Sequence, residues 1–346
     1  MNVEAFVFDG PPRDDATPAL KMAAKRYTKS SSQQELRGLT LLFTHCIGAH
    51  KEQWEPVIER LFDTQQTKHE TIRVREAWSF DWQSHGDSAV LNREALKRRP
   101  EGVSAYEWSS ALTAFVTSPR MQGHRIVPLG HSAGAAAVLL TTKHLPHPYP
   151  YPALILIEPT LITRELFNAY REDRMAEMDF AVSATSARRH TWGSKELAYA
   201  YFRKRVPWEF WDERVVRLLV EYGLEDSSEG SGAVTLKCDR RHEAASYPDV
   251  EPHYEGALQL GRVCHALPIH LVWGTRNDLV HEFIQDSLSD PSQGRIVASV
   301  SRIKDAGHMV VQEQPDLLAS AIIDILDGLG SGPGPGVGRS VRRAKL

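Results

Sequence analysis

The chain has 346 residues, of which 42% are hydrophobic and 25% charged, as in ordinary globular proteins. Its 41 basic and 44 acidic residues give a formal net charge of −3, which provides no general field for nucleic acid or an anionic membrane. No apolar run reaches the roughly 18 residues of a membrane helix, and the first residues lack a secretory signal. We expect an intracellular protein with no nucleic-acid partner and no stable membrane anchor.

The cysteines and histidines predict neither a disulfide framework nor a metal site. Cys46, Cys238 and Cys264 are odd in number and lack C-x-x-C spacing, so we expect free thiols in a reducing compartment. The sequence has no H-E-x-x-H motif and no clustered Cys/His spacing, and we predict no metal and no cofactor.

The first third of the chain predicts strands that alternate with helices. In chain order we expect strands at 3–7, 19–28 and 39–43, a helix at about 51–62, a strand at 71–77 and a helix at about 104–116. His45 is interpreted as a loop-packing residue, and Lys51 and Glu52 as surface residues that open a helix. The segment Asp81–Ser88 is interpreted as a polar turn with a structural role only.

A strand, a sharp turn and a helix follow, and the turn carries a G-x-S-x-G sequence. The apolar residues 126–129 lead into Gly130-His-Ser-Ala-Gly134, and small helix-forming residues come next. The two glycines remove side chains where the strand and helix backbones pass closest. Ser132 is therefore the candidate nucleophile, and the backbone N–H of Ala133 can face a developing oxyanion.

The alternation stops after an apolar strand at 153–157 and resumes about a hundred residues later. Residues 160–264 are expected to be mostly helical and are rich in aromatic side chains, which indicates an inserted cap. We then expect a strand at 269–273, a helix from about 280, a strand at 296–300 and an amphipathic helix at 315–329. The fold class is α/β: a mostly parallel sheet with helices on both faces and a helical cap between two late strands.

The C-terminal segment predicts a flexible linker followed by a targeting signal. Residues 330–338 are dominated by glycine and proline, as in a flexible linker. The final Ala344-Lys345-Leu346 resembles the Ser-Lys-Leu peroxisomal signal that an import receptor binds. The alternative is a frayed basic tail. We favour import into the peroxisomal matrix, and divide the chain into residues 1–159 and 265–329 (core), 160–264 (cap) and 330–346 (tail).

A serine nucleophile needs a base, and the base needs an orienting acid. His308, on a loop after the last strand, is the candidate base, since the expected chain order is Ser, acid, His. Two acids compete: Asp278 follows the strand after the cap, and Glu158 ends the strand before it. Position alone slightly favours Asp278.

The second oxyanion donor is expected from the loop after the early apolar strand. We assign it to the backbone N–H of Ile47, which would pair with that of Ala133. Cys46 stands where many such enzymes carry glycine, and it leaves the neighbouring N–H available.

Several motifs together resemble the fungal peroxisomal α/β-hydrolases, which include toxin-biosynthesis hydrolases, a mycophenolate-pathway acyl-CoA hydrolase and a yeast peroxisomal lipase. The motifs are His45-x-x-Gly48, Lys51-Glu52-x-Trp54-Glu55-Pro56, Asp81-x-x-Ser-His-Gly-Asp-Ser88, Gly130-His-Ser-Ala-Gly134, Leu156-Ile-Glu-Pro159 and Gly307-His308. The resemblance spans roughly residues 27–329 and implies an α/β-hydrolase fold. It also implies that Glu158 is the acid, because the mycophenolate-pathway enzyme carries its acid before the cap in a Leu-Asp-Pro sequence. Asp278 stays the alternative.

The favoured function is hydrolysis of an ester or thioester, foremost a peroxisomal acyl-CoA in fungal secondary or lipid metabolism. The alternatives are a carboxylesterase or lipase that acts on free esters, and a non-catalytic binding protein on the same fold. Four cap residues could bind CoA phosphates, although ordinary solvated helix charges are the better interpretation: Arg171, Arg174, Arg188 and Arg189. The sequence leaves open whether the chain forms a homodimer.

Overall fold

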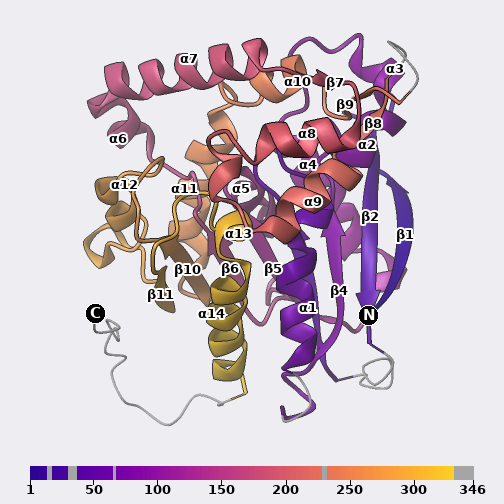
Figure 1. Ribbon diagram of the computed structural model, residues 1–346. Coiled ribbons are helices and arrows are strands. Elements are labelled where there is room, and N and C mark those ends of the chain that lie inside the picture. The colour runs from indigo at the N-terminus through magenta and orange to yellow at the C-terminus, as the bar shows by residue number, and fades with distance from the viewer. Residues whose placement is uncertain (14–17, 30–36, 65–67, 228–231, 331–346) are drawn as a thin grey trace.

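A computed structural model describes residues 1–13, 18–29, 37–64, 68–227 and 232–330. In this part of the chain, eight strands form one sheet with the order β1-β2-β4-β3-β5-β6-β10-β11 (Figure 1). Their bounds are β1 Asn2–Asp9, β2 Lys21–Thr28, β3 Leu39–Thr44, β4 Val74–Phe80, β5 Arg125–His131, β6 Leu154–Ile157, β10 Ile269–Gly274 and β11 Ser299–Ile303. The pairs β1–β2 and β2–β4 are antiparallel and the remaining pairs are parallel.

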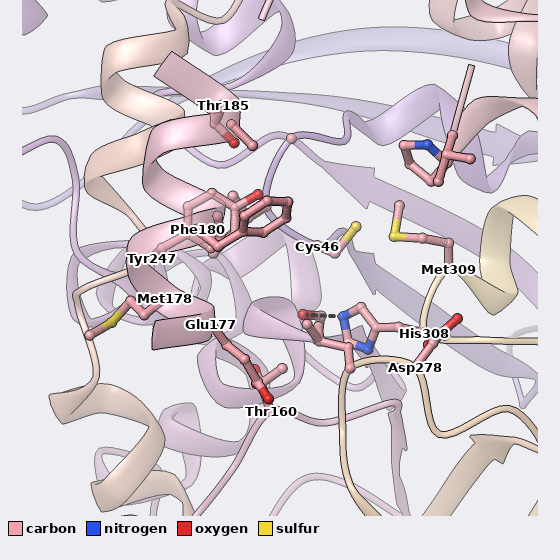
Figure 2. A pocket seen from close by; sticks show the side chains of 18 of the residues that line it. Cys46, Thr160, Glu177, Met178, Phe180, Thr185, Tyr247, Asp278, His308 and Met309 are labelled. Carbon is pink, nitrogen blue, oxygen red and sulfur yellow. Dashed lines mark hydrogen bonds between the residues drawn. The ribbon is translucent and has the colours of Figure 1, made fainter. Parts of the chain in front are cut away.

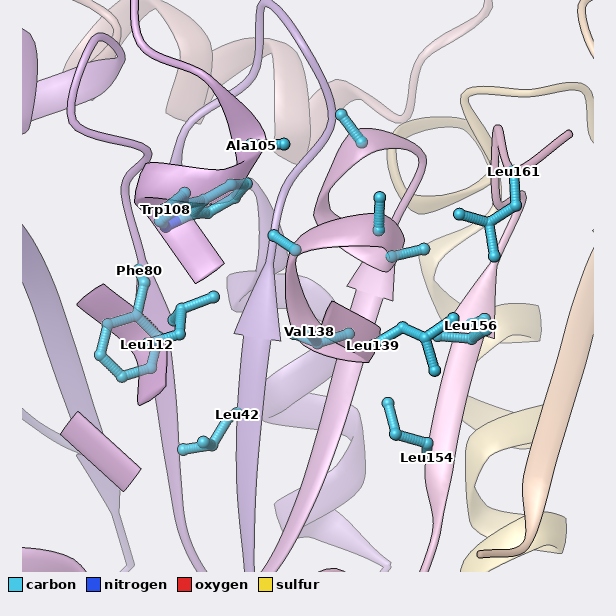
Figure 3. Packing of buried hydrophobic residues seen from close by; sticks show 14 of the residues in the cluster. Leu42, Phe80, Ala105, Trp108, Leu112, Val138, Leu139, Leu154, Leu156 and Leu161 are labelled. Carbon is cyan, nitrogen blue, oxygen red and sulfur yellow. The ribbon is translucent and has the colours of Figure 1, made fainter. Parts of the chain in front are cut away.

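Helices cover both faces of this sheet, as predicted. On one face, α1 (Glu55–Asp63) packs against α14 (Pro315–Gly328); on the other, α5 (Ala133–Leu140) lies between α4 (Ala105–Val116) and α11 (Glu251–Val263). Side chains along each central strand alternate between the two cores. In β6, Leu154 and Leu156 pack under α5 with Val138 and Leu139 (Figure 3), whereas the two isoleucines between and after them join the other core.

Two strands begin three residues later than predicted. The strand predicted at 71–77 forms as β4, because the backbone N–H groups of Ile72 and Arg73 donate instead to the carbonyl of His69 in a turn. The strand predicted at 296–300 forms as β11, and Ile296 is an exposed loop residue. The predicted helix at 51–62 is a 3-10 turn at Lys51–Trp54 that continues into α1.

Between β6 and β10 lie α6 (Arg164–Ala169), α7 (Arg171–Ala187), α8 (Lys195–Phe202), α9 (Glu213–Tyr222) and α10 (Arg240–Ala245). This segment also contains a three-stranded antiparallel sheet, β7 (Thr191–Trp192), β9 (Val234–Leu236) and β8 (Leu224–Asp226), which the prediction of a helical cap missed. Strands of two or three residues are too short for an alternating pattern to be visible. Buried aromatic and aliphatic side chains of α8 and α9 form a separate core with Trp192 and Trp211.

The division of the chain at residues 160 and 264 stays a prediction. The last helix of the predicted cap segment, α11, packs on α5 and contributes Tyr254, Ala257 and Leu260 to the core between α5 and the sheet.

The remaining α-helices are α2 (Gly86–Leu91), α3 (Arg93–Leu96), α12 (Glu282–Ser287) and α13 (Val310–Glu313). Short 3-10 turns also occur at Pro119–Met121, Thr141–Lys143, Trp208–Phe210 and Pro291–Gln293. None of the helices in the described ranges is long and apolar enough to cross a membrane.

Candidate active site

The carboxyl ends of three neighbouring strands bring Ser132, Glu158 and His308 together. Ser132 follows β5, Glu158 follows β6 and His308 lies on the loop after β11. The Oγ atom of Ser132 is 2.9 Å from Nε2 of His308, and Nδ1 of the same ring is 3.2 Å from Oε2 of Glu158. All three residues are buried. A hydroxyl, an imidazole and a carboxylate thus form one continuous hydrogen-bonded chain.

The turn at Ser132 is held by close backbone packing. Ser132 has a φ of 57°, which non-glycine residues rarely adopt, and its N–H donates to the carbonyl of Ile157. A Cβ atom on Gly130 would lie 2.4 Å from the Gly134 carbonyl oxygen, and one on Gly134 would lie 2.7 Å from that of His45. Both positions therefore require glycine, which explains the G-x-S-x-G pattern physically.

The two acids predicted from the sequence contact different parts of His308. Glu158 accepts the imidazole Nδ1–H with one oxygen, while its other oxygen accepts the N–H of Gly274 at 2.5 Å. Asp278 instead accepts the backbone N–H of His308 at 2.7 Å, and its side chain is 46% exposed. Asp278 therefore touches the loop but not the imidazole ring.

Two further residues fix the His308 loop, and sequence reasoning missed both. His131, next to Ser132, donates from Nε2 to the carbonyl of His308 at 2.7 Å, and burial holds its pKa well below the usual range, so the ring stays neutral. Glu313 accepts the N–H of Gly307 at 2.9 Å and pairs with Arg276. In the sequence these residues differ in no way from ordinary helix or turn residues.

The loop that carries Ile47 is tied to the same turn. Thr44 donates a side-chain hydrogen bond to the carbonyl of Gly134 at 3.0 Å, so the loop after β3 lies beside the first turn of α5. Ala133 is the first residue of α5, and such an N–H has no acceptor within its own helix. Ile47 and Ser132 line the same cavity. These are the two N–H groups that the sequence predicts as oxyanion donors.

Residues 41–321 match the family model described as "Alpha/beta hydrolase family". The chain belongs to the alpha/beta hydrolase family.

Named relatives agree with the resemblance predicted from the motifs. A type I acyl-CoA thioesterase of Penicillium brevicompactum is 26% identical over 280 residues, which are 80% of this chain and 58% of the thioesterase. The peroxisomal membrane protein LPX1 of Saccharomyces cerevisiae is 31% identical over 160 residues, 45% of this chain and 40% of LPX1. The chain thus spans 58% or less of the length of these relatives.

Solved structures support the hydrolase fold. The peroxisomal alpha-beta-hydrolase Lpx1 of Saccharomyces cerevisiae superposes with a TM-score of 0.75 at 18% identity, over 100% of this chain and 93% of Lpx1. At that identity the likeness establishes the fold alone.

Behind the Ile47 loop of this hydrolase-family protein lies a buried ionic network. The Nζ atom of Lys51 is 2.9 Å from Glu52, 2.9 Å from Asp81 and 2.6 Å from Asp87. Asp81 also accepts the backbone N–H of Lys51 at 2.8 Å. The prediction that Lys51 and Glu52 are surface residues was wrong, since both are 2% exposed or less. Although burial alone would lower the pKa of Lys51, the three carboxylates raise it well above its ordinary value.

Replacing Lys51 with methionine is expected to lower the free energy of unfolding by about 3–5 kcal/mol, because buried carboxylates would lose their counter-charge. Denaturant unfolding measures this change. The control is Lys97→Met, which removes an exposed lysine and is expected to change stability by less than about 0.5 kcal/mol. A loss below about 1 kcal/mol for Lys51→Met would contradict the role of this network.

His45 packs the same loop, in agreement with its predicted role. Its Nδ1 donates to the carbonyl of Cys46 at 2.7 Å, and its Nε2 accepts the backbone N–H of Trp82 at 3.0 Å. The ring also packs against Trp108. Burial lowers the pKa of His45 to about 3, and an Nε2 that accepts an N–H cannot also carry a proton.

His45 therefore predicts a pH dependence of stability. Unfolded histidine titrates near pH 6.5, whereas the folded His45 ring stays neutral to about pH 3. Between these values only the unfolded state binds the proton, so stability is full above pH 6.5 and falls by about 1.4 kcal/mol per unit below it. Between pH 6 and 4, the slope of unfolding free energy against pH should be smaller in His45→Gln by about 1.4 kcal/mol per pH unit, which corresponds to one proton. Equal slopes in the variant and the wild type would refute this assignment.

The candidate nucleophile opens onto a cavity of about 1750 Å³. In Figure 2, Phe180 and Tyr247 lie on one side of the view and His308 and Asp278 on the other, with Cys46 between them. Most of the wall is apolar or aromatic. Burial raises the pKa of the Cys46 thiol to about 12, so this cysteine is not a competing thiolate.

The four arginines predicted as CoA-phosphate candidates differ in their contacts. Arg174 pairs with Glu177, and Arg188 forms two hydrogen bonds with Glu243 at 2.9 and 2.5 Å. Arg189 lies on the cavity wall without a described carboxylate partner, and Arg171 is an exposed residue of α7. The three cysteines are free thiols, and the described residues contain no group of three side chains suited to a metal ion.

Proposed function

We propose that this chain is a serine hydrolase that cleaves an ester or thioester, with an acyl-CoA as the favoured substrate. The observation that carries the proposal is the continuous chain of hydrogen bonds from Ser132 through His308 to Glu158, at 2.9 and 3.2 Å. In it Ser132 is the nucleophile, His308 the general base, and Glu158 the acid that orients the ring.

The reaction has two half-reactions. His308 accepts the Ser132 proton as Oγ attacks the acyl carbonyl, and the N–H groups of Ile47 and Ala133 stabilise the oxyanion. The imidazolium then protonates the leaving thiolate or alkoxide as its bond to the acyl carbon breaks. Water next attacks the acyl carbon while His308 accepts its proton. The imidazolium then protonates Oγ of Ser132 as the bond between Oγ and the acyl carbon breaks, which releases the carboxylic acid and free Ser132. Glu158 stabilises the imidazolium and stays ionised.

Two observations favour a bulky acyl-CoA over a small ester. The cavity volume of about 1750 Å³ exceeds the roughly 300–1,000 Å³ typical of small-molecule sites, and its wall is largely apolar. A relative bears the name acyl-CoA thioesterase. A carboxylesterase or lipase with the same residues is the second candidate, and a non-catalytic binding protein the third.

A fluorophosphonate probe and a substrate panel separate the three candidates. We expect the probe to label the purified wild type, and acyl-CoAs to release free thiol faster than matched oxygen esters release alcohol. Absence of labelling and of turnover would leave only the binding protein. Labelling with ester turnover but no thiol release would identify a carboxylesterase or lipase.

We further propose that the protein acts in the peroxisome, since its yeast relative is named a peroxisomal protein. The predicted receptor signal at Ala344, Lys345 and Leu346 lies outside the described residues. Import by a receptor, the matrix location and a homodimer stay predictions.

A further inference from the structure

Six cations and five carboxylates line the active-site cavity, but they are not evenly paired. Three ion pairs are closed within it: Arg174 with Glu177, Arg188 with Glu243, and Arg276 with Glu313, with Asp278 3.6 Å from the same guanidinium. The charged lining residues outside these ion pairs are three cations, Arg189, Lys204 and Arg205, and one carboxylate, Glu209. None of the three cations has a carboxylate within 4 Å among the described residues. This part of the wall therefore carries excess positive charge.

Two of the three cations stack on one aromatic ring, and Lys204 adjoins one of them in the chain. The guanidinium carbons of Arg189 and Arg205 lie 5.6 and 4.5 Å from the ring centre of Tyr201. Arg189 follows the C-terminal end of α7, whereas Lys204 and Arg205 follow that of α8, so two separate segments converge here. All three side chains are exposed. Stacking on Tyr201 fixes the guanidinium planes. Arg189 donates its Nε–H to the carbonyl of Thr191 at 2.9 Å, and its terminal N–H groups have no partner among the described residues.

We propose that Arg189, Lys204 and Arg205 bind the phosphate groups of a CoA leaving group while the acyl chain occupies the apolar part of the cavity; this site rests on the proposed thioesterase function. Guanidinium groups suit phosphate because each one can donate two parallel N–H bonds to its oxygens. The cluster lines the same cavity as Ser132 and His308 but is water-exposed, as a polyanion requires. The arginines already closed in ion pairs, Arg174 and Arg188, are not part of it.

Cations at helix C-termini also interact favourably with the helix dipole, and this could account for one such residue at each end. It does not account for the convergence of two segments on Tyr201, nor for three cations against one carboxylate in a cavity whose other ion pairs are closed. An anionic lipid headgroup offers the same phosphate chemistry as CoA, so the test must distinguish the two sources.

The test is the triple variant Arg189→Gln, Lys204→Gln and Arg205→Gln. With decanoyl-CoA we expect KM to rise about tenfold or more while kcat stays within about twofold, because the lost contacts bind substrate and transition state equally. With decanoyl-N-acetylcysteamine, a thioester without phosphates, both constants should stay at their wild-type values. Calorimetry with free CoA, which needs no turnover, should show binding to the wild type that weakens about tenfold in the variant.

The control variant removes three exposed cations elsewhere: Lys97→Gln, Arg98→Gln and Lys304→Gln. We expect it to behave as wild type in every assay. Unchanged CoA affinity in the first variant, or an equal rise in KM for both thioesters, would overturn the phosphate site. Unchanged CoA affinity with lost binding to phosphatidylglycerol vesicles would assign the cluster to lipid headgroups instead. Failure of the wild type to hydrolyse any thioester would refute the proposed thioesterase function, and CoA calorimetry would still test the site.

Discussion

Replacement of Ser132 with alanine is expected to lower kcat for acyl-CoA hydrolysis by about 10⁶-fold. The variant loses the oxygen that forms the acyl-enzyme, and His308 loses the hydroxyl that it contacts at 2.9 Å. Steady-state release of CoA thiol, followed with a thiol reagent, measures the effect. Because Ser132 occupies a strained turn, its thermal unfolding must also be compared with that of the wild type.

Ser110→Ala is the matched control, since its hydroxyl only donates to a carbonyl within α4. We expect kcat to be unchanged in this variant. Activity of Ser132→Ala within tenfold of wild type, in a folded sample, would mean that another group is the nucleophile.

Glu158→Gln is expected to lower kcat by about 10⁴-fold, while Asp278→Asn changes it by less than about tenfold. The first change removes the negative charge that stabilises the imidazolium and allows the wrong tautomer of His308. The second keeps an oxygen in place, because an amide carbonyl can still accept the backbone N–H of His308. Rates with one thioester at a fixed pH compare the two variants directly.

This pair separates the two acids that the sequence left in competition. If Asp278→Asn lost 10⁴-fold and Glu158→Gln kept most of its activity, the acid would be Asp278 and the imidazole would have to rotate from its position in the structure. A third variant, Asp278→Ala, completes the comparison. With Glu158 as the acid, this change removes the acceptor for the His308 N–H, which we expect to lower activity more than Asp278→Asn does.

The sequence predicted those parts of the site that depend on local backbone geometry. The strand, turn and helix around Ser132 require glycine at two fixed positions, so this motif can be recognised from the sequence alone. His308 was predicted as the base from its place after the last strand. The parallel sheet was also predictable, because buried strands such as β3 and β6 are continuously apolar.

The contacts that sequence reasoning missed depend on residues far apart in the chain. Lys51 reads as the start of an amphipathic helix, and only the fold reveals that Asp81 and Asp87 surround its amino group. The choice between Glu158 and Asp278 depends on where each carboxylate points, which strand position does not determine. Similarly, nothing in the sequence distinguishes Arg188, paired with Glu243, from its neighbour Arg189.

The segment between β6 and β10 also contacts the loop that carries Ile47. Gly48 has a φ of 77°, and a Cβ atom there would lie 2.6 Å from Oε1 of Glu243, the carboxylate that pairs with Arg188. One ion pair of this segment thus packs directly on a loop of the candidate oxyanion hole, which explains why this position carries glycine.

The central claim is that Ser132 forms the acyl-enzyme. Its most direct test is titration of the wild type with diisopropyl fluorophosphate, followed by peptide mapping and by measurement of residual thioesterase activity. We predict one phosphoryl adduct per chain, located on Ser132, and a loss of CoA release in proportion to its formation. An adduct on a different residue, or full activity in a chain modified at Ser132, would contradict the account.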